Sequence, residues 1–351
     1  EKAYKAAKER KLPCIYVING MCDEGVDFYS IIDDLRDQFG SSVCPILIPE
    51  IDGVNAKSYV NIIEGKAYTY NGGKAAECAM PEILQVDDYK AYLTEAVAES
   101  SEELMDKYFE AGELTADEIK SGLKAAIMNR SVCPVICCDA VNLDAVDVLL
   151  NTIVDFTPSP ADIGSFMAKT EDGEDIELKV DEEDKNAAII FKTVADPFVG
   201  KLSYIKVISG QISPAKEVFN MRLGEKMRIT KVVTSRGKKQ IDIDYIGAGD
   251  IGAIPKLSGA KTGDTLCSPH RKVVIEGATY PGTAFSMAIY PKKKGDEDKV
   301  AQAMSKLMGE DQTIAFKSDA ETKEMVVSGM GEAHIDVIVS KLKAKYNVEV
   351  N

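Results

Sequence analysis

The sequence predicts a multidomain chain in which an α/β part, an all-β barrel and an α+β unit follow one another. Strand and helix patterns alternate in residues 1–163, short strands recur at turn spacing in residues 164–272, and residues 280–351 follow a βαββαβ order. A chain of 351 residues, 45% of them hydrophobic, is long enough to bury several separate cores. We therefore place the three domains at these ranges.

The first part reads as a sheet whose strands are separated by helices. The expected strands are Pro13–Asn19, Cys44–Ile48 and Val132–Cys137. One helix repeats Phe28, Ile32, Leu35 and Phe39 up to Gly40, and another carries Val146, Leu149, Leu150 and Ile153 on one face up to Pro158. This alternation predicts a parallel sheet. Residues 1–9 are expected to end a helix, so that the chain starts inside an α/β fold.

Residues of about 52–130 interrupt the alternation and are expected to form an inserted subdomain. They contain strand patterns at Val60–Ile63 and Lys66–Tyr70, and two helical stretches. Thr115 and Glu118 have the spacing of a capping box, which predicts a helix start just before a periodic apolar run.

The middle part, from Ala187 to Ser268, reads as one closed antiparallel barrel of short strands. The triplet Asp196-Pro197-Phe198 is expected to break the pairing after the first strand, because proline cannot donate to a ladder. Lys226–Val233 is expected to be one strand, with the turn of its hairpin at Thr234–Lys239.

The last part predicts strands and helices in the order of a split ferredoxin-like unit. Its first helix has an apolar face that ends at Met308, and its second carries Ile335, Ile338, Val339 and Leu342. A final strand is expected at Val348–Val350.

Composition excludes several classes of protein. No apolar run of about 18 residues is present, so a membrane span is not expected. The eight cysteines have no paired CxxC spacing and no nearby histidines, so we expect neither a metal site nor a disulfide framework, and a reducing cytoplasm fits this usage.

Charge is segregated along the chain, whose net charge is −15. Residues 171–185 carry nine acidic residues and two lysines, and we expect a solvated linker or strand-edge loop there. Residues 222–239 carry seven lysines and arginines against Glu225 alone, so this basic hairpin is suited to face a polyanion.

Several motifs resemble elongation factor G, a translational GTPase. They are DPFVGKLSYIKVISG at Asp196–Gly210, AGDI at Ala248–Ile251, TGDTL at Thr262–Leu266 and SGMGEAHIDVI at Ser328–Ile338. The resemblance implies the end of a P-loop GTPase domain with its insertion, then a translation-factor β-barrel (domain II) and a ferredoxin-like domain III. The KAYTY strand at Lys66–Tyr70 and the size of the insertion favour the translocase over elongation factor Tu.

For the intact protein the resemblance implies GTP or GDP with Mg²⁺ as cofactor, the ribosome as partner through rRNA and a small-subunit protein, and a role in translocation in the cytoplasm. It implies no membrane and no DNA. The GxxxxGK[ST] phosphate loop is not found in these 351 residues, so we expect this stretch by itself to hold no cofactor and to be inactive as a GTPase. We identify no catalytic residue and no metal ligand.

The two base-reading motifs of the family align here with altered residues. The NKxD motif corresponds to Asn19-Gly20-Met21-Cys22, with Asp23 one position late, so the aspartate that would bond the guanine edge is replaced by Cys22. The second motif corresponds to Cys138-Asp139-Ala140, where the Ala140 amide is a candidate for a guanine carbonyl and Asp139 adds a negative charge. Asn19 as a simple strand-end turn residue is an equal alternative.

Eight basic residues are candidates for rRNA contact. They are Arg228, Lys231, Arg236, Lys238 and Lys239 in the barrel, and Lys292, Lys293 and Lys294 in the third domain. Ordinary solubilising charges are the competing interpretation. Three functional hypotheses stay open: a ribosome-binding piece of a translocase, a GTPase with altered base specificity, and a divergent regulator or ribosome-protection paralogue without a guanine-nucleotide cycle.

Overall fold

The structure is a computed structural model of the whole chain, and it describes residues 2–53, 55–196, 200–237, 239–319, 321–322 and 324–351. It divides into two compact units, Glu1–Pro158 and Ser159–Asn351. Each is described by itself below.

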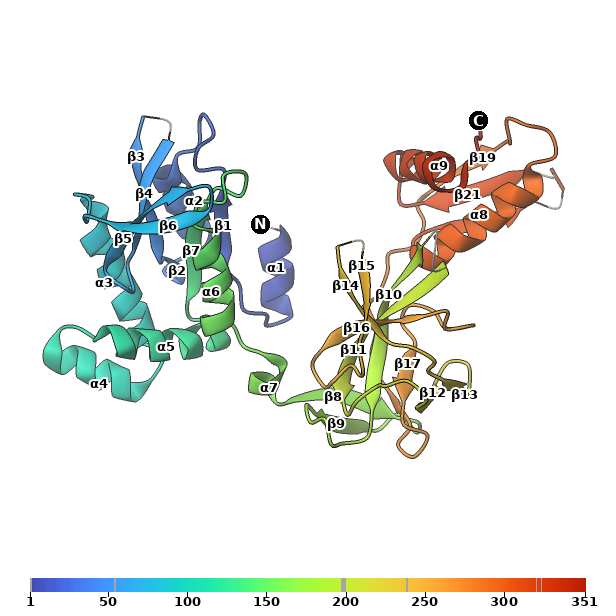
Figure 1. Cartoon of the computed structure of the whole chain (residues 1–351), viewed down its shortest axis with the longest axis horizontal. Helices are drawn as coiled ribbons and strands as arrows, with labels where there is room; N and C mark the ends of the chain where they lie inside the picture. The colour runs from blue at the N-terminus through green and yellow to red at the C-terminus, as the bar shows by residue number, and fades with distance from the viewer. Residues whose placement is uncertain (1, 54, 197–199, 238, 320, 323) are drawn as a thin grey trace. The chain divides into compact units, whose positions relative to one another are not determined.

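The first unit is built on a parallel sheet of order β1-β7-β2, which confirms the predicted parallel arrangement (Figure 1). The strands are β1 (Tyr16–Asn19), β7 (Cys133–Cys138) and β2 (Val43–Pro45), and the helices beside them are α1 (Lys2–Glu9), α2 (Phe28–Phe39) and α6 (Val146–Phe156). Helix α2 begins where the Asp27 carboxylate accepts hydrogen bonds from the amides of Tyr29 and Ser30, and it ends at Gly40, whose φ of 84° suits glycine.

The inserted subdomain combines an antiparallel sheet of order β3-β4-β5-β6 with three helices, one more than predicted. The elements are β3 (Leu47–Asp52), β4 (Asn55–Asn61), β5 (Lys66–Asn71), β6 (Lys74–Cys78), α3 (Gln85–Ala98), α4 (Glu102–Ala111) and α5 (Ala116–Asn129). The capping box of Thr115 and Glu118 is confirmed at the start of α5. Strand β6 was not predicted, because its residues are mostly exposed and do not alternate between apolar and polar side chains.

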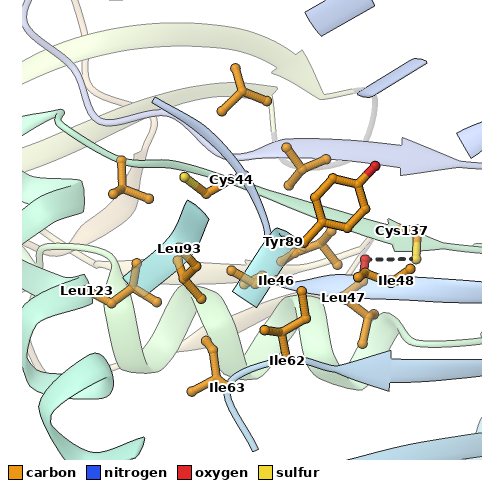
Figure 2. Close-up of a cluster of buried hydrophobic side chains, with 14 of the residues drawn as sticks. Cys44, Ile46, Leu47, Ile48, Ile62, Ile63, Tyr89, Leu93, Leu123 and Cys137 are labelled. Carbon is orange, nitrogen blue, oxygen red and sulfur yellow. Dashed lines mark hydrogen bonds between the residues drawn. The ribbon is translucent and has the colours of Figure 1, made fainter. Parts of the chain in front are cut away.

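One hydrophobic core joins the parallel sheet to the insertion (Figure 2). Cys44, Ile46 and Leu47 meet Leu93 of α3 and Leu123 of α5, all of them buried. The Cys137 thiol donates to the carbonyl of Leu47 at 3.3 Å. Each fully buried aliphatic side chain contributes about 1.5–3 kcal/mol, so the insertion and the sheet stabilise one another.

The predicted inner face of α6 is correct at Leu149 but wrong at Leu150 and Ile153. Leu150 and Ile153 are 58% and 44% exposed, whereas Val148, Leu149 and Phe156 pack on the core. Helix α6 has apolar residues on more than one side, so periodicity alone could not identify the packed face.

The second unit begins with α7 (Pro160–Ile163) and a small sheet of order β18-β8-β9. Its strands are β8 (Ser165–Thr170), β9 (Asp175–Lys179) and β18 (Val273–Val274). Strand β9 lies inside the acidic run 171–185, which was expected to be a linker or loop. That interpretation missed the alternation of Ile176 and Leu178 with charged residues, through which β9 packs one face on a buried cluster.

The barrel sheet has eight antiparallel strands in the order β13-β12-β17-β10-β11-β16-β14-β15. The strands are β10 (Ala187–Asp196), β11 (Gly200–Ser209), β12 (Glu217–Asn220), β13 (Glu225–Arg228), β14 (Val233–Arg236), β15 (Lys239–Asp242), β16 (Ile251–Pro255) and β17 (Thr265–Cys267). The sheet encloses a core that includes Ile190, Ile205, Val218 and Leu266. A bridge between Ile212 and Ile246 adds a pairing outside the ladder.

Two predictions about barrel strands need correction. Strand β10 ends at Asp196, which is still paired with Gly200 of β11, so the ladder includes the first residue of the triplet; Pro197 and Phe198 lie outside the described residues. The expected strand Lys226–Val233 is two strands, because β13 ends at Arg228 and pairs with β12, whereas β14 begins at Val233 and pairs with β15.

The aspartate of the TGDTL motif, Asp264, is held in place by donors from the barrel. The Asp264 carboxylate is 2% exposed and accepts from Arg222 Nε at 2.5 Å, from Asn220 Nδ2 at 2.9 Å and from the Lys261 amide at 2.9 Å. Burial by itself would raise the pKa of Asp264, but these donors outweigh it and lower the pKa. Asp264 therefore ties the turn that contains it to the end of β12 and the residues that follow β12.

The third domain has the predicted order of strands and helices. Its elements are β19 (Phe285–Ile289), α8 (Glu297–Glu310), β20 (Ala315–Ser318), β21 (Met325–Gly329) and α9 (Glu332–Tyr346), with sheet order β19-β21-β20. Helices α8 and α9 pack on each other and on the sheet through Val300, Met304, Ile335 and Leu342 (Figure 1). The predicted last strand is reduced to one bridge, Val350 with Pro291. The predicted succession of α/β, all-β and α+β parts is confirmed.

Candidate functional site

The two altered base-reading loops lie side by side at the carboxyl ends of β1 and β7. These strands are parallel neighbours, and Asn19 stands opposite Cys138 in the register. The carboxyl edge of a parallel sheet is the usual position of a ligand site in α/β folds. The structure brings together four of the five candidates for nucleotide binding: Asn19, Cys22, Asp139 and Ala140.

Hydrogen bonds within the chain join the two loops. The side-chain oxygen of Asn19 accepts from the Ala140 amide at 2.9 Å. Asp139 is 2% exposed, and its carboxylate accepts from the amides of Cys22 at 3.2 Å, Val141 at 3.0 Å and Asn142 at 2.9 Å. The Ala140 amide, expected to be a donor to a ligand carbonyl, thus already has an acceptor in Asn19.

The ionisation of these groups follows from the same contacts. Burial would raise the pKa of Asp139, but the three amides outweigh it, so the pKa is lowered and the carboxylate is ionised at neutral pH. Burial, followed by the charge of Asp139, raises the pKa of Asp144, whose backbone pairs with that of Asp139. Burial also raises the pKa of the Cys22 thiol. The site is therefore negative and has no acidic thiol to act as a nucleophile.

Gly20 and Asp23 do not form a base-reading arrangement. Gly20 has a φ of 79°, and a Cβ built there would lie 2.5 Å from the Asp23 carboxylate. A lysine at position 20 would be strained in this conformation. Asp23 is exposed, and its amide donates to the carbonyl of Gly20 at 2.9 Å, closing a turn. The one-residue displacement thus removes Asp23 from the shared site.

The insertion borders this site, which the sequence could not reveal. The backbone of Ala56 in β4 lowers the pKa of the Cys22 thiol against the larger effect of burial, and the buried Tyr59 hydroxyl has no hydrogen-bond partner among the described residues. Tyr29 of α2 also donates to the carbonyl of Pro49 at 3.1 Å. Strand β4 therefore borders the loop that contains Cys22, and β3 is bonded to α2.

The four described basic candidates of the barrel are exposed, as expected, but they do not lie on one uninterrupted strand. Arg228 ends β13, Lys231 lies between β13 and β14, and Arg236 and Lys239 flank the tip of the β14–β15 hairpin. Lys231 pairs with Asp242 at 2.7 Å, which reduces its free charge. Lys238 lies outside the described residues.

The second basic cluster follows β19. Lys292 pairs with Glu349 at 3.4 Å, whereas Lys293 and Lys294 are exposed. In the described part of the chain, five of the candidates have no ion-pair partner: Arg228, Arg236, Lys239, Lys293 and Lys294. These five carry the cationic character of the two clusters.

Among the described residues, no group of three or more His, Cys, Asp or Glu side chains is arranged to hold a metal ion. In the same part of the chain, no helix is both long and apolar enough to cross a membrane.

Comparison with known proteins identifies the two later domains. The family model of elongation factor G domain 2 matches residues 185–269, and that of elongation factor G domain III matches residues 280–351. A crystal structure of ttk003000868 from Thermus thermophilus superposes with a TM-score of 0.84 at 26% sequence identity. The match covers 100% of this chain and 50% of that one, so the chain spans about half the length of that relative. The two later domains of the chain are therefore elongation factor G-like: residues 185–269 are similar to domain 2 of that translation factor and residues 280–351 to its domain III.

Proposed function

We propose that this chain is the ribosome-binding part of an elongation factor G-like protein that acts in translocation, and that it contacts rRNA and a neighbouring small-subunit protein through its barrel. The observation that carries the proposal is the exposed basic tip of the β14–β15 hairpin on a chain whose net charge is −15. Phosphate contacts require lysine and arginine, and an acidic protein must concentrate them locally.

A test is co-sedimentation of the chain with small ribosomal subunits at several salt concentrations. The triple variant Arg236→Glu, Lys238→Glu and Lys239→Glu should bind less tightly and with a flatter dependence on salt. Lys299→Glu on α8, an exposed lysine paired with Asp296, is the matched control and should bind like the parent chain.

The altered loops favour a second candidate function, a divergent paralogue that binds the ribosome without a guanine-nucleotide cycle. Asn19 and Asp139 already satisfy the amides of Ala140 and Cys22, so no base is needed to order these loops. A translocase of this family would use GTP with Mg²⁺ in the cytoplasm, held by a phosphate loop outside these 351 residues. Nucleotide binding by a longer chain that includes that region distinguishes the two candidates.

A further inference from the structure

A cavity of about 570 Å³ lies within the first unit, between strand β5 of the insertion and the helices α5 and α6. Tyr68 and Tyr70 line it from β5, and Ser121 lines it from α5. Thr152 and Phe156 line it from α6. A cavity of this volume can hold a small molecule. The residues of the two altered base-reading loops do not line it, so it is a separate feature of the unit.

Carboxylates dominate the charge around this cavity. Its described lining contains four of them, against Lys120 as the one cation: Glu64, Asp117, Asp147 and Asp155. Within the described ranges, none of the four carboxylates forms an ion pair with a lysine or an arginine, and Lys120 is exposed and unpaired as well. Like charges around one concave surface repel one another and attract cations to it.

Two tyrosines of β5 hold two of these carboxylates in place. Tyr70 donates to Asp147 Oδ1 at 2.8 Å, and both residues are half-buried. Tyr68 donates to Glu64 Oε2 at 2.8 Å. The second oxygen of each carboxylate has no donor among the described residues, so it is available to a ligand. The rings of Tyr68, Tyr70 and Phe156 add aromatic surface, which attracts organic cations.

Thr152 of α6 provides an independent sign of a ligand. It is 3% exposed and lines the cavity. A buried threonine in a helix commonly donates to the carbonyl four residues earlier, as Thr94 does to Lys90 at 2.7 Å. The Thr152 hydroxyl makes no hydrogen bond with any described residue, and it is not one of the unpaired polar atoms that the chain encloses completely. It is therefore open to the cavity, where its oxygen can accept from an ammonium group.

The distribution of the carboxylates selects the kind of cation. They come from the β4–β5 turn, from α5 and from α6, and among the described residues no three acidic side chains converge closely enough to hold a metal ion. A compact ion would therefore meet only part of this charge. A linear polyamine carries several ammonium groups on an aliphatic chain, so it can reach carboxylates that lie apart while its methylene groups contact the aromatic rings.

We propose that the cavity binds a linear polyamine, with one ammonium group between Asp147 and the Thr152 hydroxyl, another near Asp117 or Asp155, and the aliphatic chain against the Tyr70 ring. Alkyl ammonium groups are protonated at neutral pH, so the ligand neutralises the carboxylates that repel one another. The inference is independent of the proposed ribosomal function. The ligand would link the insertion to helix α6 of the parallel-sheet part.

Isothermal titration calorimetry of the whole chain with spermidine tests the site, with Mg²⁺ at the same ionic strength as the compact cation. Spermidine should bind with saturation at one site and raise the melting temperature of the chain. Mg²⁺ should bind at least about tenfold more weakly. Asp147→Asn keeps an acceptor for the Tyr70 hydroxyl and removes the charge, so it should weaken spermidine about tenfold. Asp34→Asn, on an exposed part of α2 outside the cavity, should change the affinity less than about twofold.

Thr152→Val keeps the shape of the side chain and removes only the unpartnered hydroxyl, so it separates binding from folding. It should leave the unliganded chain at least as stable as the parent and weaken spermidine about threefold. Absence of saturable spermidine binding would overturn the proposal. So would spermidine binding that neither Asp147→Asn nor Thr152→Val weakens, or Mg²⁺ binding as tight as that of spermidine, which would show general attraction of cations to an acidic surface.

Discussion

The Ala140 amide donates to the side-chain oxygen of Asn19 at 2.9 Å, across two loops that are 121 residues apart in sequence. Together with the contact from the Cys22 amide to Asp139, this bond closes the edge of the parallel sheet without a ligand. The loops that would read a base in the family thus hold one another here.

Asp139→Ala should destabilise the first unit by about 1–2 kcal/mol, because it removes the acceptor of three amides. Two of them, those of Val141 and Asn142, belong to exposed residues and can bind water in its place. Urea unfolding followed by circular dichroism measures this. Asp23→Ala, the exposed neighbour, is the control and should stay within about 0.5 kcal/mol of the parent. Equal stability of Asp139→Ala and Asp23→Ala would mean that Asp139 does not hold the loops.

The contribution of Asp139 should depend on pH with a defined sign. Its pKa is lowered in the folded state, so the stabilisation is complete above the ordinary aspartate pKa and is lost as the pH falls through the folded value. The difference in unfolding free energy between the parent and Asp139→Ala should therefore shrink below about pH 4. A difference that stays constant down to about pH 2 would contradict the ionised, amide-bound carboxylate.

Guanine nucleotides should bind this chain more weakly than about 1 mM, since Cys22 replaces the base-reading aspartate and no phosphate loop is present in the sequence. Calorimetry with GDP checks this. The double variant Gly20→Lys and Cys22→Asp should not restore binding, because Gly20 adopts a left-handed conformation in which lysine is strained. Micromolar affinity for GDP in the parent chain would disprove the prediction.

Asp264→Ala should destabilise the second unit by about 2–3 kcal/mol, somewhat less than the loss of a fully buried pair, because Arg222 is 42% exposed. Thermal unfolding of the chain gives the measurement. Asp242→Ala, which removes an exposed pair with Lys231, should cost less than about 1 kcal/mol. A smaller loss in Asp264→Ala than in Asp242→Ala would show that the TGDTL aspartate does not tie the barrel together.

Sequence patterns predicted the elements that have one buried face and clear ends. The buried run Cys133–Cys138, the capping box at Thr115 and the helical face from Val300 to Leu307 each follow one period or one cap. Strand β9 was missed because acidic residues masked the alternation of Ile176 and Leu178. The packed face of α6 could not be selected because the helix is apolar on several sides.

The candidate site was predictable only in part. Parallel strands required that the ends of β1 and β7 be neighbours, so the meeting of Asn19 with Ala140 follows from the topology. The burial of Asp139 and its three amide donors depend on loop conformations and on the insertion behind them, which no local pattern contains.

The most direct test of the account is the salt dependence of binding to small ribosomal subunits, measured by co-sedimentation for the parent chain and for the Arg236, Lys238 and Lys239 triple glutamate variant. The account predicts weaker binding by the variant and a slope of log K against log salt that is flatter by about one unit for each lost phosphate contact. Equal affinity and an equal slope for both proteins would contradict it, and would show that the barrel hairpin is a solvated surface.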